Sequence, residues 1–398
     1  MGGGAPDVVA ATGWVRTLAG IDVYLAVRAR SHELTRASMD EAVADGRLRV
    51  SPAARGCIYL ISEAHLGLAL AHARALARPR TERDLAKAGV STREVEELAA
   101  GVLDVLRAGP MTTASVRKAL PAGAARSLGA RGKRVGLSSP LPVALRELEF
   151  AGRIERALPD GRLDTERYHW RIVSGKRRTA IADAGDHQAR VRALVELFLR
   201  VSGPATHKQL ATWIGVSKRA VTSALAELPV VSVAIDWPDG FADDDSARRA
   251  PHVLLETDLE ELQHAATPAP RFAFLPFEDA LITAHGGPAP FVDPRYHDRP
   301  VDSWGGSRPT TIARSRHVGQ RPLMCGDEMI GFWEYDRDAE TIVCGAFRPL
   351  SSSEKRSLRE ASESLFAFIR DQLGHARSFS LDTDDAVRGR VQILRAMS

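Results

Sequence analysis

The sequence predicts an α+β protein with repeated three-helix units that each end in a β-hairpin, followed by a small C-terminal antiparallel β-barrel or sheet and a long helix. Three observations support this class. Residues 191–228 show helical periodicity interrupted by short breaks, residues 92–175 repeat that order, and short apolar runs between turns follow residue 267. Apolar spacing is the primary signal of secondary structure, and a repeated order of elements indicates an internal duplication.

The clearest unit begins with VRALVELFLRVSGPATHKQLATWIGVSKRAVTSALAEL, residues 191–228. Apolar residues at helical spacing predict a first helix, Thr206 is expected to cap a second, and Ser217 is expected to cap a third after the turn at Gly215. A helix, a glycine turn and a further helix form a helix-turn-helix. Apolar residues 230–235 and the turn at 237–240 add a hairpin, so a winged helix is predicted over residues 187–257.

Two other segments follow a similar order. Residues 92–175 contain a helix that stops at Gly109-Pro110, a second helix, a long glycine-rich break at 121–138, a third helix over 141–152 and a hairpin around Pro159-Asp160-Gly161. Residues 13–80 form a less regular version, with short strands at 48–50 and 57–61 before a long helix. The sequence therefore predicts tandem winged-helix domains over 13–80, 92–175 and 187–257, with a polar linker at 78–91.

The C-terminal part has a different composition. Residues 268–309 are rich in Pro and Gly, and four or more short strands follow, which is typical of a small antiparallel barrel or sheet. Ser351 and Glu354 form a capping signal that opens a long helix to about residue 373. We expect a β-barrel domain with a terminal helix over 268–373, a partly disordered tail over 374–398 and a flexible lead-in over 1–12.

Composition excludes several classes of protein. The chain has 398 residues, 44% of them hydrophobic, and a net charge of +4, which suits a globular protein that binds a polyanion. Its three cysteines form no CxxC pair, so no structural zinc site or disulfide framework is implied. Since neither a membrane span nor a signal peptide is recognisable, we expect a cytoplasmic, nucleoid-associated protein without metal or cofactor.

Basic residues in two places predict contact with double-stranded DNA. In a helix-turn-helix the third helix enters the major groove with its N-terminal residues nearest the bases. The segment from 107 to 178 is the most basic of the chain, and a solvated loop is the alternative to phosphate contact there. The predicted DNA-binding residues are Arg126, Arg131, Lys133, Arg134, Lys176, Arg177, Arg178, Lys208, Lys218, Arg219, Thr222 and, before a strand, Arg55.

With these elements placed, the chain resembles the AlkZ/YcaQ-like winged-helix DNA glycosylases. The matching segments are VYLAVRAR (23–30), RGCIYLISEAHL (55–66), the helix-turn-helix segment described above, RFAFLPFEDALI (271–282), DEMIGFWEYD (327–336) and CGAFRPLSSSE (344–354). The resemblance covers residues 13–373. It implies tandem winged helices and a C-terminal β-barrel that clamp duplex DNA, and hydrolysis of the N-glycosidic bond to a bulky alkylated purine.

One motif departs from the family pattern. Active members carry Gln-x-Gln or Gln-x-Asp just before the segment that matches residues 23–30. An ungapped match places Arg16-Thr17-Leu18 there, and no glutamine precedes Gln188. Gly20-Ile21-Asp22 fills the same place if the loop shifts, which retains Asp22 but not the first glutamine.

The chemistry needs a group that stabilises an oxocarbenium-like sugar and positions a water molecule, for which a carboxylate is suitable. Asp22 is the first catalytic candidate, and capping of the helix at Val23 is its structural alternative. Glu278 and Asp279 are the second candidate, and their alternative is a loop cap or a salt bridge. His285 and His297, in Pro/Gly-rich loops, are further candidates for DNA contact.

Three hypotheses remain open at this point. The first is a DNA glycosylase that uses Asp22 or the pair Glu278 and Asp279. The second is a non-catalytic DNA-binding protein, a regulator or damage-recognition factor, on the same scaffold. The third is a protein-interaction module whose winged helices bind partner domains. The full-length resemblance favours the first hypothesis, and the missing glutamine favours the second.

Overall fold

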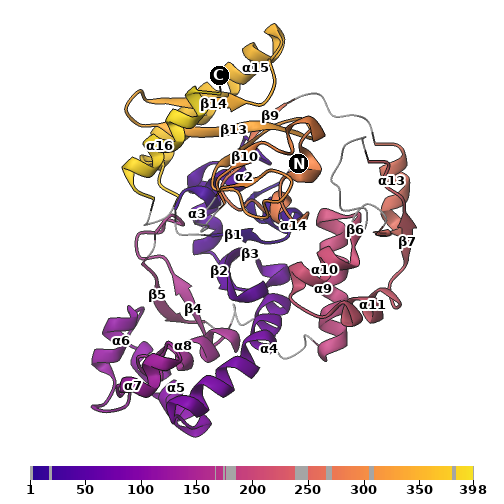
Figure 1. Ribbon diagram of the computed structural model, residues 1–398. Helices are drawn as coiled ribbons and strands as arrows, with labels where there is room; N and C mark the ends of the chain where they lie inside the picture. The colour runs from indigo at the N-terminus through magenta and orange to yellow at the C-terminus, as the bar shows by residue number, and fades with distance from the viewer. Residues whose placement is uncertain are drawn as a thin grey trace.

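A mixed arrangement of helices and small sheets makes up the protein. The computed structural model describes residues 3–17, 20–165, 167–173, 175, 185–237, 250–265, 271–303, 309–378 and 382–397, and of Arg55 only the backbone. In Figure 1 the N-terminal body (the central body) lies at the centre, and a second helical unit lies below it. A third unit lies to its right, and a C-terminal sheet lies above.

The N-terminal body contains a three-stranded antiparallel sheet of order β1-β3-β2. Thr35 caps α3, and the strands predicted at 48–50 and 57–61 form and pair with Val50 opposite Leu60. Its elements are α1 (Ala5–Thr12), β1 (Val15–Arg16), α2 (Asp22–Arg28), α3 (Arg36–Ala44), β2 (Leu48–Pro52), η1 (Ala54–Gly56), β3 (Ile58–Ser62) and α4 (Glu63–Ala88).

Two expectations for this body were wrong. The lead-in forms the helix α1, because Val8 and Val9 are buried in the core that α1 shares with α2 and α3. The polar stretch 78–91 is not a linker, since α4 continues to Ala88 and ends at the left-handed Gly89. Its charged residues pair at helical spacing, as Arg78 with Glu82, so they mark the exposed face of a helix rather than a loop.

The second unit follows α4 and packs on it through α8. Three of its helices and a two-stranded hairpin match the expected order, and the long break before the third helix contains an additional short helix. The elements are α5 (Thr92–Leu106), α6 (Thr113–Ala119), α7 (Gly129–Arg134), α8 (Leu141–Phe150), β4 (Ile154–Ala157) and β5 (His169–Ile172). They enclose a separate hydrophobic cluster that includes Val102, Val116 and Leu145.

The loop that continues the β4–β5 hairpin past the Pro-Asp-Gly turn docks against the central body. Leu163 is fully buried, and its backbone N–H donates to the Tyr24 hydroxyl at 2.7 Å. Asp164 binds His375, a residue of the C-terminal part, at 2.9 Å. Leu163 and Asp164 therefore anchor this loop to the rest of the protein.

The third unit has the local geometry that the sequence predicts. The side chains of Thr206 and Ser217 cap α10 and α11, and Gly215 adopts the left-handed conformation between them. Its elements are α9 (His187–Ser202), β6 (Ala205–Thr206), α10 (His207–Ile214), α11 (Lys218–Leu225), β7 (Val230–Val233) and β8 (His252–Leu255), and α13 (Leu259–Gln263) follows. Trp213 stacks on Trp14 with ring centroids 4.8 Å apart, which fixes the unit to the central body.

The C-terminal part contains a four-stranded antiparallel sheet of order β14-β13-β12-β9. Ser351 and Glu354 form the expected capping box at the start of α15. The elements are β9 (Phe272–Phe274), α14 (Ala280–Ala284), β10 (Pro300–Val301), β11 (Thr310–Thr311), β12 (Arg321–Cys325), β13 (Glu328–Asp336), β14 (Thr341–Ala346), α15 (Ser352–Phe368), the π-helical turn η7 (Ile369–Leu373) and α16 (Asp384–Arg395).

The expectation of a partly disordered tail was wrong. Residues 382–397 contain α16, which packs on β13 and β14 through Val387, Val391 and Leu394. These apolar residues have helical spacing, but the helix is short and mostly polar. The sheet that they pack on identifies them as the buried face of a helix. A search of the described residues finds no helix with the length and apolarity that a membrane span requires.

Candidate functional site

Three consecutive residues after β9, Phe277, Glu278 and Asp279, have three different sets of partners. The Phe277 ring lies under the guanidinium groups of Arg321 and Arg390, at 5.0 and 5.1 Å. Glu278 has a φ of +54°, which is uncommon for a residue with a Cβ. Such strained conformations cost about 1–3 kcal/mol and are concentrated at functional sites. The backbone therefore turns sharply at Glu278. The Glu278 carboxylate contacts other residues than Phe277 and Asp279 do.

The Glu278 carboxylate is held by two cationic or potentially cationic side chains. Arg16 Nη1 lies 2.5 Å from Oε2, and His317 Nδ1 lies 2.9 Å from both carboxylate oxygens. The Glu278 side chain is 2% exposed, whereas Arg16 and His317 are 25% and 40% exposed. The cluster of Arg16, Glu278 and His317 is thus a buried carboxylate under two solvent-accessible side chains.

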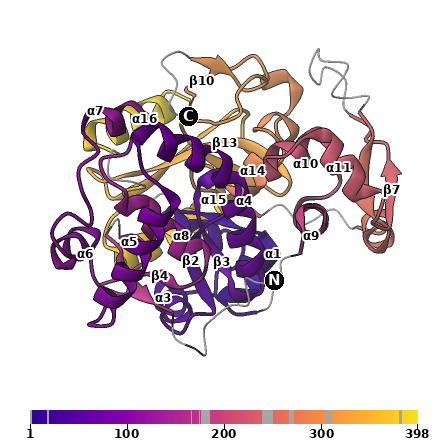
Figure 2. The ribbon, with the colours of Figure 1, turned by 90° about the horizontal axis from the view of Figure 1, so that it is seen from below.

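This cluster joins distant parts of the chain. Arg16 belongs to β1 of the central body, and His317 belongs to the segment between β11 and β12. The helix α14, which follows Asp279, lies beside α10 of the third unit in both views (Figures 1 and 2), and its Ala284 belongs to that unit's hydrophobic cluster. The cluster therefore lies where the N-terminal body, the C-terminal part and the third unit approach one another.

The partners of Asp279 hold the chain in place. Arg30 binds both of its carboxylate oxygens, at 2.9 and 2.7 Å, and Oδ1 also accepts the backbone N–H of Leu281 at the start of α14. Its side chain is fully buried. Both structural alternatives for this residue, a helix cap and a salt bridge, are present together, so Asp279 holds the segment in place and leaves Glu278 as the more accessible carboxylate of the pair.

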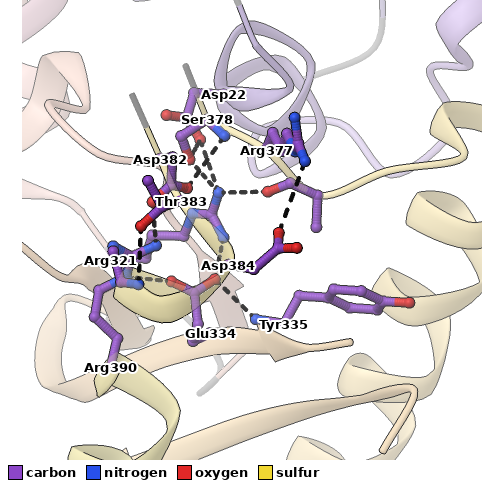
Figure 3. Close-up of polar contacts among 12 residues, drawn as sticks. Asp22, Arg321, Glu334, Tyr335, Arg377, Ser378, Asp382, Thr383, Asp384 and Arg390 are labelled. Atoms are coloured by element: carbon purple, nitrogen blue, oxygen red, sulfur yellow. Dashed lines mark hydrogen bonds and ion pairs between the residues drawn. The ribbon is translucent and has the colours of Figure 1, made fainter. Parts of the chain in front are cut away.

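Asp22 lies in a buried ionic network rather than at a surface (Figure 3). Its Oδ1 accepts from the Ser378 hydroxyl at 3.1 Å and lies 3.4 Å from Arg321 Nη2. Asp22 is the first residue of α2, whose N-cap is Ile21, so capping of a helix at Val23 is not its role. A Cβ at Gly20 would lie 2.1 Å from the Ser378 carbonyl oxygen, which shows how tightly the C-terminal segment covers this loop.

The network extends across the sheet to α16. Arg321, fully buried, pairs with Glu334, and Arg390 binds Glu334 at 2.6 Å and Asp382 at 2.8 Å. Three carboxylates therefore share two guanidinium groups. Burial raises the pKa of Asp22 to about 7, an effect that the nearby Arg321 only partly offsets.

The predicted DNA-binding residues of the second unit differ in exposure and partners. Arg126 is bound to Glu94 at 2.8 and 3.1 Å and to the Gly89 carbonyl, so it ties the unit together. Arg131, Lys133 and Arg134 are exposed on α7. Lys176, Arg177 and Arg178 lie outside the described residues, as does the side chain of Arg55.

In the third unit, α11 presents an exposed basic N-terminus. Lys218, Arg219 and Thr222 are exposed, and the Thr222 hydroxyl lies 3.2 Å from His207 Nδ1. Lys208 is exposed on the preceding helix α10. The corresponding helix of the second unit, α8, begins with Leu141 and Pro142 and has most of its residues buried, so of these two helices α11 is the one with an exposed basic N-terminus.

Sequence reasoning did not identify His317 or the contact of Arg16 with Glu278. It considered His285 and His297 instead, but His297 is 5% exposed and binds backbone carbonyls. Burial lowers the pKa of His285 to about 4, so this side chain is neutral near pH 7. The only local signal for His317 is its place in the basic stretch ARSRH. Within the described ranges, no group of three or more His, Cys, Asp and Glu side chains is arranged to hold a metal ion.

The family model and the structure comparison agree on one family. The family described as "DNA glycosylase AlkZ-like" matches residues 20–368. The structure is similar to that of the Streptomyces sahachiroi DNA glycosylase AlkZ, with a TM-score of 0.65 and 17% sequence identity over 94% of this chain and 92% of that one. No match was found among curated proteins. Since the family match covers most of the chain, this protein belongs to the AlkZ-like DNA glycosylase family.

Proposed function

We propose that this protein hydrolyses the N-glycosidic bond of bulky alkylated purines in duplex DNA, in DNA repair or self-resistance to genotoxins, and that His317 and Glu278 carry the chemistry. The observation behind this proposal is the hydrogen bond that a buried carboxylate accepts from a half-exposed imidazole, beside Arg16, the residue that an ungapped match places at the family's first glutamine. A cytoplasmic, nucleoid-associated location follows from this substrate.

The His317–Glu278 pair has the geometry of an oriented general base. An ionised carboxylate only accepts hydrogen bonds, so His317 donates through Nδ1–H, and the tautomer that acts as a base has its lone pair at Nε2. A buried carboxylate that fixes the tautomer and orientation of a histidine is a recurrent device for activating a nucleophile. Because Glu278 is buried and His317 is not, Nε2 is the atom available to a water molecule or substrate.

The reaction can be written with these two residues and water. An alkylated purine such as N7-alkylguanine is already cationic, so its bond to C1′ breaks as the electron pair moves to N9 and neutralises the base. A water oxygen forms the new bond to C1′ and its proton moves to His317 Nε2. The Glu278 charge stabilises the resulting imidazolium and the developing oxocarbenium ion. The products are the free alkylpurine and an abasic site.

We assign residues 92–175 and 187–257 to tandem winged helices. The scaffold would hold the duplex through these two units. In the third unit the basic start of α11, with Lys218 and Arg219, suits the major groove, and Thr222 lies one turn further along the same helix. In the second unit the exposed α7 residues Lys133 and Arg134 suit phosphate contact. The exposed Lys208 would add a further phosphate contact near the third unit.

One observation favours the alternative, a non-catalytic DNA-binding protein. Arg16 lies 2.5 Å from Glu278, and the ungapped match places Arg16 where active family members have a glutamine. A guanidinium neutralises the carboxylate and opposes a positively charged sugar, so it disfavours the transition state. On this alternative the cluster of Arg16, Glu278 and His317 would bind DNA backbone without releasing a base.

The decisive experiment incubates duplex DNA that contains N7-alkylguanine with the wild-type protein, His317→Ala and His375→Ala, and detects abasic sites by alkaline strand cleavage. His375 is a matched control, because it is 39% exposed and also binds a buried carboxylate, that of Asp164. We expect abasic sites with the wild type and with His375→Ala, and their loss with His317→Ala. Tight binding by all three proteins without base release would support the non-catalytic alternative.

A further inference from the structure

The segment between β11 and β12 has a backbone held in one position. The Thr311 carbonyl accepts from the N–H groups of Arg314 and Ser315, at 3.1 and 2.9 Å, and Ser315 is 4% exposed. On the other side, Gly287 approaches so closely that a Cβ there would lie 2.2 Å from the Ser315 carbonyl oxygen. The side chains on this segment are therefore presented from a rigid support.

Arg314 and Arg316 flank the buried Ser315, and both are exposed. Neither has an ion pair or a side-chain hydrogen bond within the described part of the chain. Many other arginines do: Arg295, for example, is 73% exposed and still binds Asp293 at 2.6 Å. The two guanidinium groups are therefore accessible to a ligand outside this chain, and an anion suits their charge and donor geometry.

His317, the residue directly after Arg316, is anchored to the buried Glu278. Arg316 and Arg314 therefore lie one and three residues before His317, the residue that we assign to catalysis. A guanidinium binds phosphate oxygens through two parallel hydrogen bonds, which fixes position as well as charge. An anion bound by such a pair would have a defined position relative to His317.

We propose that Arg314 and Arg316 bind phosphates of the DNA strand next to the nucleotide that faces His317. This inference rests on the proposed function for the identity of the ligand, and it identifies a phosphate site that sequence reasoning did not find. The site lies on the C-terminal part, separate from α7 and α11. It would supply the contact that aligns the damaged nucleotide with the His317–Glu278 pair.

The test compares Arg314→Gln/Arg316→Gln with Arg356→Gln/Arg359→Gln in binding to undamaged duplex DNA, measured by fluorescence anisotropy from about 50 to about 200 mM salt. Arg356 and Arg359 are exposed on α15 and make no ion pair among the described residues, so the control loses the same charge elsewhere. Each lost phosphate contact lowers the slope of log affinity against log salt by about 0.9. We expect a decrease of about 1.8 for the first variant and none for the second.

A further variant, Arg314→Lys/Arg316→Lys, keeps the charges and should retain most of the wild-type slope. Equal slopes for the two glutamine double variants would overturn the proposal, because they would show that only net charge matters. Melting followed by circular dichroism checks that each variant is folded. The assay measures binding to undamaged DNA, so a wild type that releases no base would refute the glycosylase proposal and leave this comparison valid.

Discussion

Two carboxylates of this protein are each paired with an arginine, yet their surroundings differ. Asp22 contacts Arg321, which is fully buried, and the C-terminal segment at Ser378 covers it. Glu278 contacts Arg16 and His317, which are partly exposed. Both carboxylates were candidates for catalysis from sequence, and both bind a guanidinium. The pairing alone therefore does not distinguish a structural carboxylate from a chemical one.

The difference lies in access and in charge balance. Around Asp22, three carboxylates share the guanidinium groups of Arg321 and Arg390, and burial leaves Asp22 protonated up to about pH 7. Phe277 connects the two sites, since its ring packs on both arginines and the next residue is Glu278. The buried network thus supports the backbone from which Glu278 reaches His317, and a rigid support is what an oriented catalytic group requires.

The largest effect expected is on base release. Glu278→Gln removes the charge that orients His317, so we expect the single-turnover rate of base release to fall by about 10²- to 10⁴-fold. Asp22→Asn serves as the comparison, because Asp22 is 2% exposed and the asparagine resembles its protonated form. Equal losses for the two variants would contradict the division into a structural and a chemical carboxylate.

The second effect is on stability. Arg321→Met removes the cation next to Asp22 and leaves Glu334 with Arg390 alone, and breaking a buried pair lowers the free energy of unfolding by about 3–5 kcal/mol. Arg16→Met should lower the free energy of unfolding by less, because Arg16 is partly exposed and Glu278 keeps its contact with His317. Urea denaturation of both variants measures the difference. A larger loss for Arg16→Met would show that the exposed cluster is the structural one.

The third effect is the pH dependence of stability. Since the pKa of Asp22 is about 7 in the folded protein and near 3.8 when unfolded, the folded state binds more protons between these values. Stability from this group is therefore fully present at low pH and is lost as pH rises through about 7, with a slope of up to about 1.4 kcal/mol per pH unit.

The measurement is the melting temperature of wild type and Asp22→Asn from about pH 5.5 to about pH 7.5. The lowered pKa values of His72 and His285 act in the opposite direction, because these buried histidines resist protonation as pH falls. They are common to both proteins, so the difference between the two curves isolates Asp22. Parallel curves would mean that Asp22 is ionised throughout this range.

The smallest effect concerns Arg16. Arg16→Gln introduces the glutamine that the ungapped match expects in active family members, keeps a hydrogen-bond donor for Glu278 and removes a positive charge next to the proposed sugar cation. We expect base release to rise by about three- to tenfold, which corresponds to about 1 kcal/mol of the barrier. Arg16→Lys, which keeps the charge, is the control and should show no increase. A fall in rate for Arg16→Gln would mean that the guanidinium itself assists the reaction.

Local sequence was sufficient for the helices whose boundaries depend on neighbouring residues. Thr206, Ser217 and Ser351 cap the helices that the sequence predicts, because each cap binds a backbone group three residues further on. The order of elements in the second and third units was also predictable, since hydrophobic periodicity and Gly or Pro breaks are local signals. The fold class and the family resemblance both follow from these segments.

Only the tertiary structure decided which residues meet. Glu278 lies 262 residues from Arg16 and 39 from His317, and no local pattern relates them. The burial of Asp22 depends on Ser378, at the other end of the chain, and the inner faces of α1 and α16 are defined by the elements that cover them. Helix caps act over one turn of chain, whereas access to a carboxylate depends on what packs over it.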